Sequence, residues 1–217
     1  MTTNLNLAEE LLLLAMNDEK GTVLMTAATG LPYGLAGALL IELVQAGLAR
    51  VEGKELVAEP RGAARNELLE GTLEIVRASK RARSIGHWVG KIGRSGGKIK
   101  KRLLAGLVEK RILGHEEGRF LAIFPTTRYP QADPRPEYAL RERVRSALRG
   151  MTRPDERTAS LISLVDACDL TGTLFERGER REAKKRAKEI RKSQPIGSAV
   201  AQTVEAVKAV VIIAAGS

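Results

Sequence analysis

The side chains best suited to catalysis in this sequence are two histidines and one cysteine. His87 and His115 lie in unrelated settings, with no HExxH pattern and no cysteine at a metal-ligand spacing. Cys168 is single, so it can form neither an internal disulfide nor a cysteine-based zinc site, and it fits a reducing compartment. The sequence also lacks a P-loop and a GxSxG nucleophile elbow. We therefore expect a non-enzymatic protein with no metal and no cofactor.

The charged residues give a stronger signal, because Lys and Arg gather in a basic segment, defined here as residues 77–102. This segment holds ten Lys and Arg and no Asp or Glu, so its charge of +10 equals that of the whole 217-residue chain. Several such cations on one face can hold a protein reversibly at an anionic leaflet. The candidate headgroup-binding residues surround the start of a predicted helix, whose amides favour phosphate; they are Arg94, Lys98, Lys100, Lys101 and Arg102.

Other interpretations of these residues remain open. Charge runs are often solvated faces, so the cations of the basic segment could instead pair with carboxylates elsewhere. Trp88, the single tryptophan, lies inside the segment. It is a candidate for the membrane interface, where indole rings gather, or it packs inward with Ile85 and Val89. A second basic stretch, residues 177–192, is diluted by three glutamates and is typical of a solvated helix.

The elements that must position these residues are mostly helices. Aromatic residues make up 3% of the chain, so the core must be built from Leu, Ile, Val and Ala, which suits packed helices. Asn6 and Glu9 have the spacing of a capping box for a helix over residues 7–16. Pro32 and Gly47 bound the next helix. The other expected helices cover residues 66–79, a short stretch after Ser84, 98–112, 137–148, 156–169, 179–192 and a C-terminal helix from 197, with a flexible loop at 93–97.

Two hairpins are expected, one around Gly53 within residues 48–58 and one at residues 114–124. Each follows a helix of similar sequence, so two helix-plus-hairpin units are indicated. Such units resemble winged-helix modules, and a pI near 10.0 favours phosphate backbones, so nucleic-acid binding is an alternative function. It is the less favoured one, because helix 98–112 has no row of Asn or Gln for base edges. A protein-interaction scaffold is a third interpretation.

Together these elements predict a mainly α, single globular multi-helix domain over residues 1–217 with two small β-hairpins. The N-terminus lacks the features of a secretory signal. The most apolar stretch, residues 199–215, is interrupted by Gln202, Glu205 and Lys208 and is too short to cross a bilayer. We expect a cytoplasmic protein that associates reversibly with the cytosolic face of a membrane. No heptad specifies an oligomer.

Several stretches of the chain, in order, resemble the Golgi phosphoprotein 3 family. The stretches are LAEELLLLA from Leu7, GLAGALLIEL from Gly34, RLLAGLVEKRIL from Arg102, PTTRYP from Pro125 and RTASLISLVDA from Arg157. The resemblance extends over nearly all residues from 5 to 215. A composition rich in Ala, Arg and Gly is more typical of a bacterial, in particular an actinobacterial, member than of a eukaryotic one.

This resemblance implies a helical domain that docks peripherally on membranes, binds phosphatidylinositol 4-phosphate and, in some members, forms a homo-oligomer. The family's headgroup pocket uses a Trp, an Arg and two basic residues. The Trp falls near residues 25–27 and the Arg falls on Ala36, so neither is retained. Of the basic pair, one matches Lys100 and the other falls on Gly97, with Lys98 as a substitute. The implied partner is an anionic membrane lipid, with phosphatidylinositol 4-phosphate or another phosphoinositide as the candidate.

Overall fold

A computed structural model describes residues 4–120 and 124–215 of the chain, and within these ranges the protein is mainly α, as predicted. The helices of this part are α1 (Leu7–Leu14), α2 (Leu31–Gln45), α3 (Glu67–Arg77), α4 (Ile85–Gly93), α5 (Gly96–Glu109), α6 (Arg135–Arg149), α7 (Glu156–Ala167), α8 (Arg180–Lys192) and α9 (Pro195–Ala215), with the 3-10 turns η1 (Met25–Ala27) and η2 (Thr171–Leu174). None of these helices combines the length and apolar composition that a bilayer crossing requires.

The strands of the described residues form three small antiparallel sheets. The first predicted hairpin is confirmed. A second hairpin is also present, but it pairs residues 116–120 with 124–128, later in the chain than the predicted 114–124, and the residues between its strands, 121–123, lie outside the described ranges. The sheets pair β1 (Met16–Asn17) with β2 (Thr22–Val23), β3 (Ala49–Glu52) with β4 (Glu55–Ala58) and β5 (Arg83–Ser84), and β6 (Glu116–Phe120) with β7 (Phe124–Arg128). Strand β5 was not expected from sequence. It pairs Ser84 with Glu55 and so ties the basic segment to the first hairpin.

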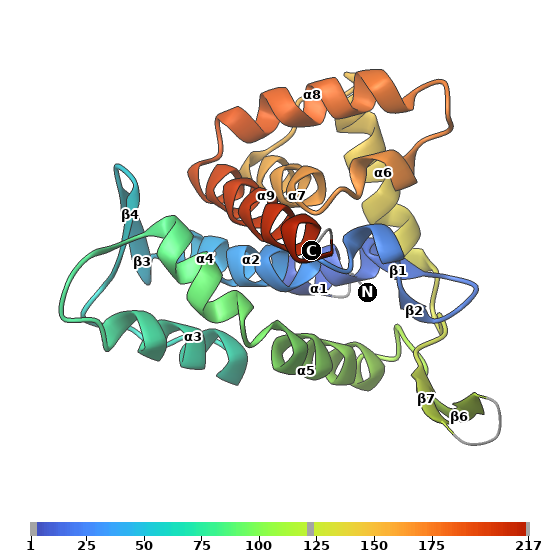
Figure 1. Ribbon diagram of the computed structural model, residues 1–217, viewed down its shortest axis with the longest axis horizontal. Helices are drawn as coiled ribbons and strands as arrows, with labels where there is room; N and C mark the ends of the chain where they lie inside the picture. Colours follow the sequence, from blue (N-terminus) through green and yellow to red (C-terminus); the bar gives the residue numbers. More distant parts are fainter. Residues whose placement is uncertain (1–3, 121–123, 216–217) are drawn as a thin grey trace.

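Helices α1 and α2 form the centre of the molecule, with α3, α4 and α5 along one side and α6 to α9 along the other (Figure 1). Every residue of α1 is buried, including Glu9 and Glu10. The predicted capping box is present: Glu9 N donates to Asn6 Oδ1 at 2.8 Å, and Asn6 N donates to Glu9 Oε2 at 2.9 Å. Lys110, the residue directly after α5, pairs with Glu9 Oε2 at 2.6 Å, so α1 is joined to the layer that carries the basic segment.

The junction between α4 and α5 is a tight packing contact, and the expectation of a flexible loop at residues 93–97 is therefore wrong. Helix α4 continues to Gly93 and α5 begins at Gly96. A Cβ at Gly93 would lie 2.5 Å from Tyr33 Cδ1, and one at Gly96 would lie 2.7 Å from Pro32 Cα. The glycines let this junction approach the start of α2, where any side chain would clash.

The first helix-plus-hairpin unit cannot present a recognition helix to DNA. Residues on all sides of α2 are buried; they are Leu31, Gly34, Leu35, Ala36, Gly37, Ala38, Leu39, Leu40, Ile41 and Leu43. A helix in this position is a core element rather than one that enters a groove. The winged-helix interpretation is wrong for this unit.

Candidate anion-binding surface

Helix α4 is amphipathic and presents a basic face to solvent. Its N-terminus is capped by Ser84, whose Oγ accepts from His87 N at 3.2 Å. Apolar residues on the inner side pack against α2 and α9. Spacings of four and three residues place His87, Lys91 and Arg94 together on the outer side, and all three are exposed. Arg83, directly before the helix, is exposed as well.

The cations around His87 affect the pKa of its side chain. The pKa of its imidazole is lowered, first by loss of hydration and then by the positive charges of Arg83, Lys91 and Arg94. The positive charges of Arg83, Lys91 and Arg94 thus all act on His87. His87 is therefore disposed to gain a proton when an anion approaches and offsets that field.

Helix α5 divides the remaining candidate residues among different sides. Lys98 and Lys101, three residues apart, are exposed on the outer side of α5. Lys100 precedes the buried Leu103 and Leu104 by three and four residues, so it lies on the inward side and is half-buried. The predicted residues do not all converge on one face.

Arg102 lies beside the acidic side of α3 rather than among free cations. Together with Arg65 it lines a depression of about 550 Å³ that also contains Glu67, Glu70 and Glu74. The carboxylate of Glu70 accepts a hydrogen bond from the backbone N–H of Ala64. Since three carboxylates surround the depression, the charge of Arg102 is locally opposed, and its expected role in headgroup binding is not supported by its position.

The structure thus defines an α4–α5 face, made of Arg83, His87, Lys91, Arg94, Lys98 and Lys101. None of its cations has a carboxylate oxygen within 4.0 Å among residues 4–120 and 124–215, whereas nine Lys and Arg elsewhere in these ranges do. Arg77, at the start of the basic segment, instead donates to the backbone carbonyls of Glu59 and Gly62 and is structural. The cations of the face are not neutralised by direct ion pairs.

Trp88 is not at the surface. Its side chain is 1% exposed in the core, so the expectation of a membrane-interface position is wrong and the alternative of inward packing is confirmed. Lys91 Nζ lies 5.2 Å from the centroid of the Trp88 ring, and the ring of His87 meets it edge-on with centroids 5.1 Å apart. Trp88 therefore packs in the core beneath Lys91 and His87.

Three members of this face were missed in the sequence as site residues: Arg83, His87 and Lys91. Their signal was present, because a helix from residue 85 with Trp88, Val89 and Ile92 inward must turn Lys91 and His87 outward. The predicted start of this helix after Ser84 is confirmed, whereas its continuation to Gly93, which adds Lys91 to the outer side, was not expected.

The positions of the family's pocket are filled differently here. Ala36 is 0% exposed in the middle of α2, and Ala27 is buried at the end of η1. Gly97 contributes no side chain, and no atom lies within 4 Å of the place where its Cβ would be. Only Lys100 of the basic pair is present, and it is half-buried. The described residues of this chain hence lack the convergent donors of that pocket. They also contain no group of three His, Cys, Asp or Glu that could hold a metal ion.

The fold and this face define a class of mainly α-helical domains that expose several cations with no ion-pair partner among the described residues. Within this class the chain belongs to the Golgi phosphoprotein 3 (GPP34) family, whose profile matches residues 7–207. The match confirms the resemblance seen in the sequence over nearly the whole chain. No individually curated protein matches the sequence.

Proposed function

We propose that this protein is a non-enzymatic peripheral membrane protein that binds anionic phospholipid through the α4–α5 face. Membership of the Golgi phosphoprotein 3 family, whose members associate with membranes and phosphoinositides, supports the proposal. The observation that carries it is the absence of any carboxylate within 4.0 Å of the cations of this face in the described residues. Such cations retain their attraction for an external anion, because no internal partner has already offset it.

The binding acts through summed charge rather than through a headgroup pocket. A phosphate monoester is recognised by convergent, charge-assisted donors. Those donors are missing at Ala36 and Gly97, while the exposed cations form a row that suits a surface. We therefore expect binding to follow the surface charge of the membrane, with little preference between phosphatidylserine and phosphatidylinositol 4-phosphate at equal charge.

Sedimentation with vesicles tests this function. The vesicles contain phosphatidylcholine alone, or phosphatidylcholine with phosphatidylserine or with phosphatidylinositol 4-phosphate at matched surface charge. The wild-type chain should sediment with both anionic preparations at low salt and with neither at high salt. The variant K91Q/R94Q/K98Q should bind roughly 100-fold more weakly, because each cation near an anionic leaflet contributes about 1 kcal/mol.

A matched control removes the same number of charges elsewhere. Lys20, Lys54 and Arg153 are exposed and lie outside the basic segment. The variant K20Q/K54Q/R153Q should keep most of the vesicle binding. Equal losses in the two variants would show that only net charge matters, and equal recovery of wild type with neutral and anionic vesicles would reject membrane binding through charge.

A further inference from the structure

Helix α8 carries a straight row of cations on the side turned away from the protein. Its inner side is formed by Ala183 and Ala187, both buried. Spacings of four, three and four residues place the cations of the opposite side in one line, called here the α8 row: Arg181, Lys185, Lys188 and Lys192. All four are exposed, and none has a carboxylate oxygen within 4.0 Å in the described part of the chain. The interpretation as a merely solvated helix leaves this alignment unexplained.

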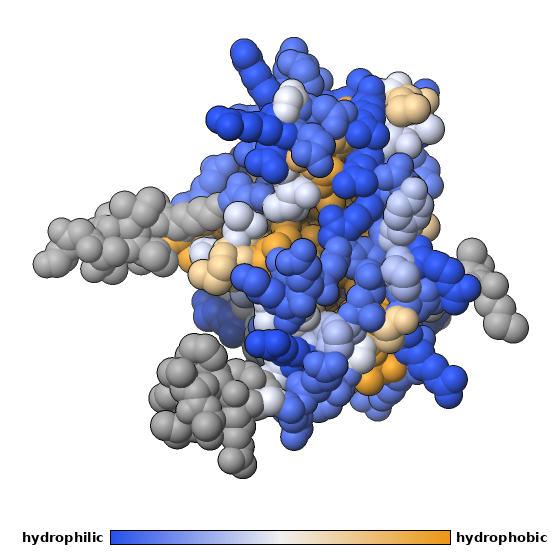
Figure 2. All heavy atoms as spheres, turned by 90° about the vertical axis from the view of Figure 1, so that its right-hand side faces the viewer, coloured by the Kyte–Doolittle hydropathy of each residue, from blue (hydrophilic) through white to orange (hydrophobic). Residues whose placement is uncertain are grey.

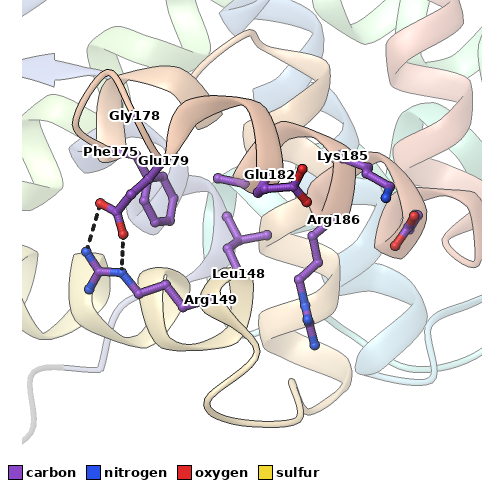
Figure 3. Close-up of a pocket in the computed structure, with 10 residues that line it drawn as sticks. Leu148, Arg149, Phe175, Gly178, Glu179, Glu182, Lys185 and Arg186 are labelled. Atoms are coloured by element: carbon purple, nitrogen blue, oxygen red, sulfur yellow. Dashed lines mark hydrogen bonds and ion pairs between the residues drawn. The ribbon is translucent and has the colours of Figure 1, made fainter.

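The carboxylates of α8 lie to one flank of the row. Glu182 and Glu189 line a hollow of about 600 Å³ between α6 and α8, together with Leu148, Phe175 and Lys185 of the row. Figure 3 shows Glu179 at the edge of this hollow, held by Arg149 with Nε to Oε1 at 2.9 Å. The acidic residues thus border the α8 row at Lys185, but among the described residues none has an oxygen within 4.0 Å of a cation of the row.

The row is held rigidly on the protein. Arg191, on the side of α8, pairs with Asp166 of α7 at 2.7 Å, and both side chains are largely buried. Near the start of the helix, Arg180 Nε donates to the carbonyl of Phe175 at 3.0 Å. Eleven residues separate the ends of the row, which corresponds to about 16 Å along a helix axis. The cations are therefore presented in a fixed line rather than on a mobile tail.

The α8 row lies at the opposite edge of the molecule from α5. Figure 1 shows α8 along the top and α5 along the bottom, with α1 and α2 between them. Figure 2 shows hydrophilic side chains standing out from the top edge. A flat membrane in contact with α5 would leave this edge open to a soluble partner. The row is thus a second surface, distinct from the α4–α5 face.

We propose that the α8 row binds an acidic polypeptide segment of a partner protein. A single chain or helix is narrow enough to follow one line of cations, and carboxylates repeated at helical spacing match the spacing of the row. A nucleic-acid duplex or a bilayer is wider and would also meet Glu182 and Glu189. Moreover, α8 contains no aromatic, Asn or Gln residue that could stack on bases or contact their edges.

Fluorescence anisotropy with labelled poly-L-glutamate tests the proposal on the full-length chain, with a labelled DNA duplex of equal charge as the second probe. The variant K185Q/K188Q/K192Q should bind poly-L-glutamate at least tenfold more weakly than wild type. The control K20Q/K54Q/R153Q removes the same charge and should bind nearly as wild type. Glutamine favours helices, and circular dichroism of each variant confirms that α8 is retained.

The outcomes separate this surface from the proposed membrane function. The α8 variant should keep its binding to anionic vesicles, while K91Q/R94Q/K98Q should lose much less of its binding to poly-L-glutamate than the α8 variant does. Equal loss of poly-L-glutamate binding in the α8 variant and in the control would overturn the proposal. So would a preference of the α8 row for the duplex, which would assign it to nucleic acid, or a loss of vesicle binding in the α8 variant alone, which would assign it to the membrane.

Discussion

Gly96, the first residue of α5, packs directly on Pro32 near the start of α2, and a Cβ at position 96 would lie 2.7 Å from Pro32 Cα. This contact holds the α4–α5 junction, which lies between Arg94 and Lys98 in the chain, against the start of α2. A backbone atom cannot move aside as a flexible side chain can. The geometry of the basic face thus depends on the absence of a side chain at one position.

We expect Gly96→Ala to lower the free energy of unfolding by about 1–3 kcal/mol, the usual cost of forcing an extra methyl group into a packed site. Gly97→Ala is the matched control, since no atom lies within 4 Å of its Cβ position. That substitution should be neutral or stabilise by up to about 1 kcal/mol. Urea unfolding of both variants measures the difference, and equal stabilities would contradict the packing described.

The buried pair of Arg191 and Asp166 gives a pH-dependent prediction. Burial raises the pKa of Asp166, and the attraction of Arg191 opposes the rise. Arg191→Met leaves the carboxylate without its cation and should cost about 2–4 kcal/mol near pH 7. Because the folded-state pKa is then higher still, protonation favours the folded state, and the deficit should shrink as the pH falls through that pKa toward the unfolded value.

Thermal or urea unfolding of Arg191→Met at a series of pH values checks this behaviour. The double variant D166N/R191M is the control, because it has no charge left to neutralise. Its deficit relative to wild type should be smaller at neutral pH than that of the single variant. A deficit of Arg191→Met that does not change with pH would indicate lost packing alone.

His87 should make vesicle binding depend on pH. Burial and the cations Arg83, Lys91 and Arg94 lower its pKa, so the imidazole is neutral at neutral pH and adds a positive charge to the face below that pKa. Anionic headgroups favour the charged form. Affinity for phosphatidylserine vesicles should therefore rise about fivefold as the pH falls through this range, since one added cation is worth about 1 kcal/mol. The rise should be absent in His87→Gln; an identical rise in that variant would assign it to other groups.

Because Trp88 is buried, we expect its fluorescence to stay unchanged when the protein binds vesicles. The chain contains one tryptophan, so its emission reports this residue alone. Since the side chain is 1% exposed, the emission should be blue-shifted and should not change when vesicles are added. Vesicles of brominated lipid should not quench it. Strong quenching would mean that α4 rearranges on the membrane and that Trp88 reaches the acyl region.

Much of the fold was predictable because its signals are local. Asn6 and Glu9 lie three residues apart and form their capping box whatever the rest of the chain does. The turn at Gly53, with a φ of 61°, likewise requires only its own residues. The pairing of Ser84 with Glu55 is different, because contact between residues so far apart in the sequence is set by how α3 packs.

The sequence predicts that the candidate site is basic, but it does not predict how the cations are arranged. A run of cations without acids shows that a surface is basic, yet it does not show which side of a helix each cation takes. Lys100 is half-buried, and Arg102 lies in a depression with the carboxylates of α3. Both positions result from packing between helices that the sequence does not reveal. Glycines at 93 and 96 predict a loop from sequence, whereas in the structure they permit the close approach of the α4–α5 junction to α2.

The complete burial of α1 has a consequence for synthesis of the protein. Residues 7–14 pack against α2, which follows closely in the chain, but also against α5, α6 and α7, and the last of these ends at Ala167. The leucine-rich segment therefore stays without part of its final contacts until α7 has been synthesised. A nascent chain stopped before α7 would expose this segment and become a ready substrate for chaperones.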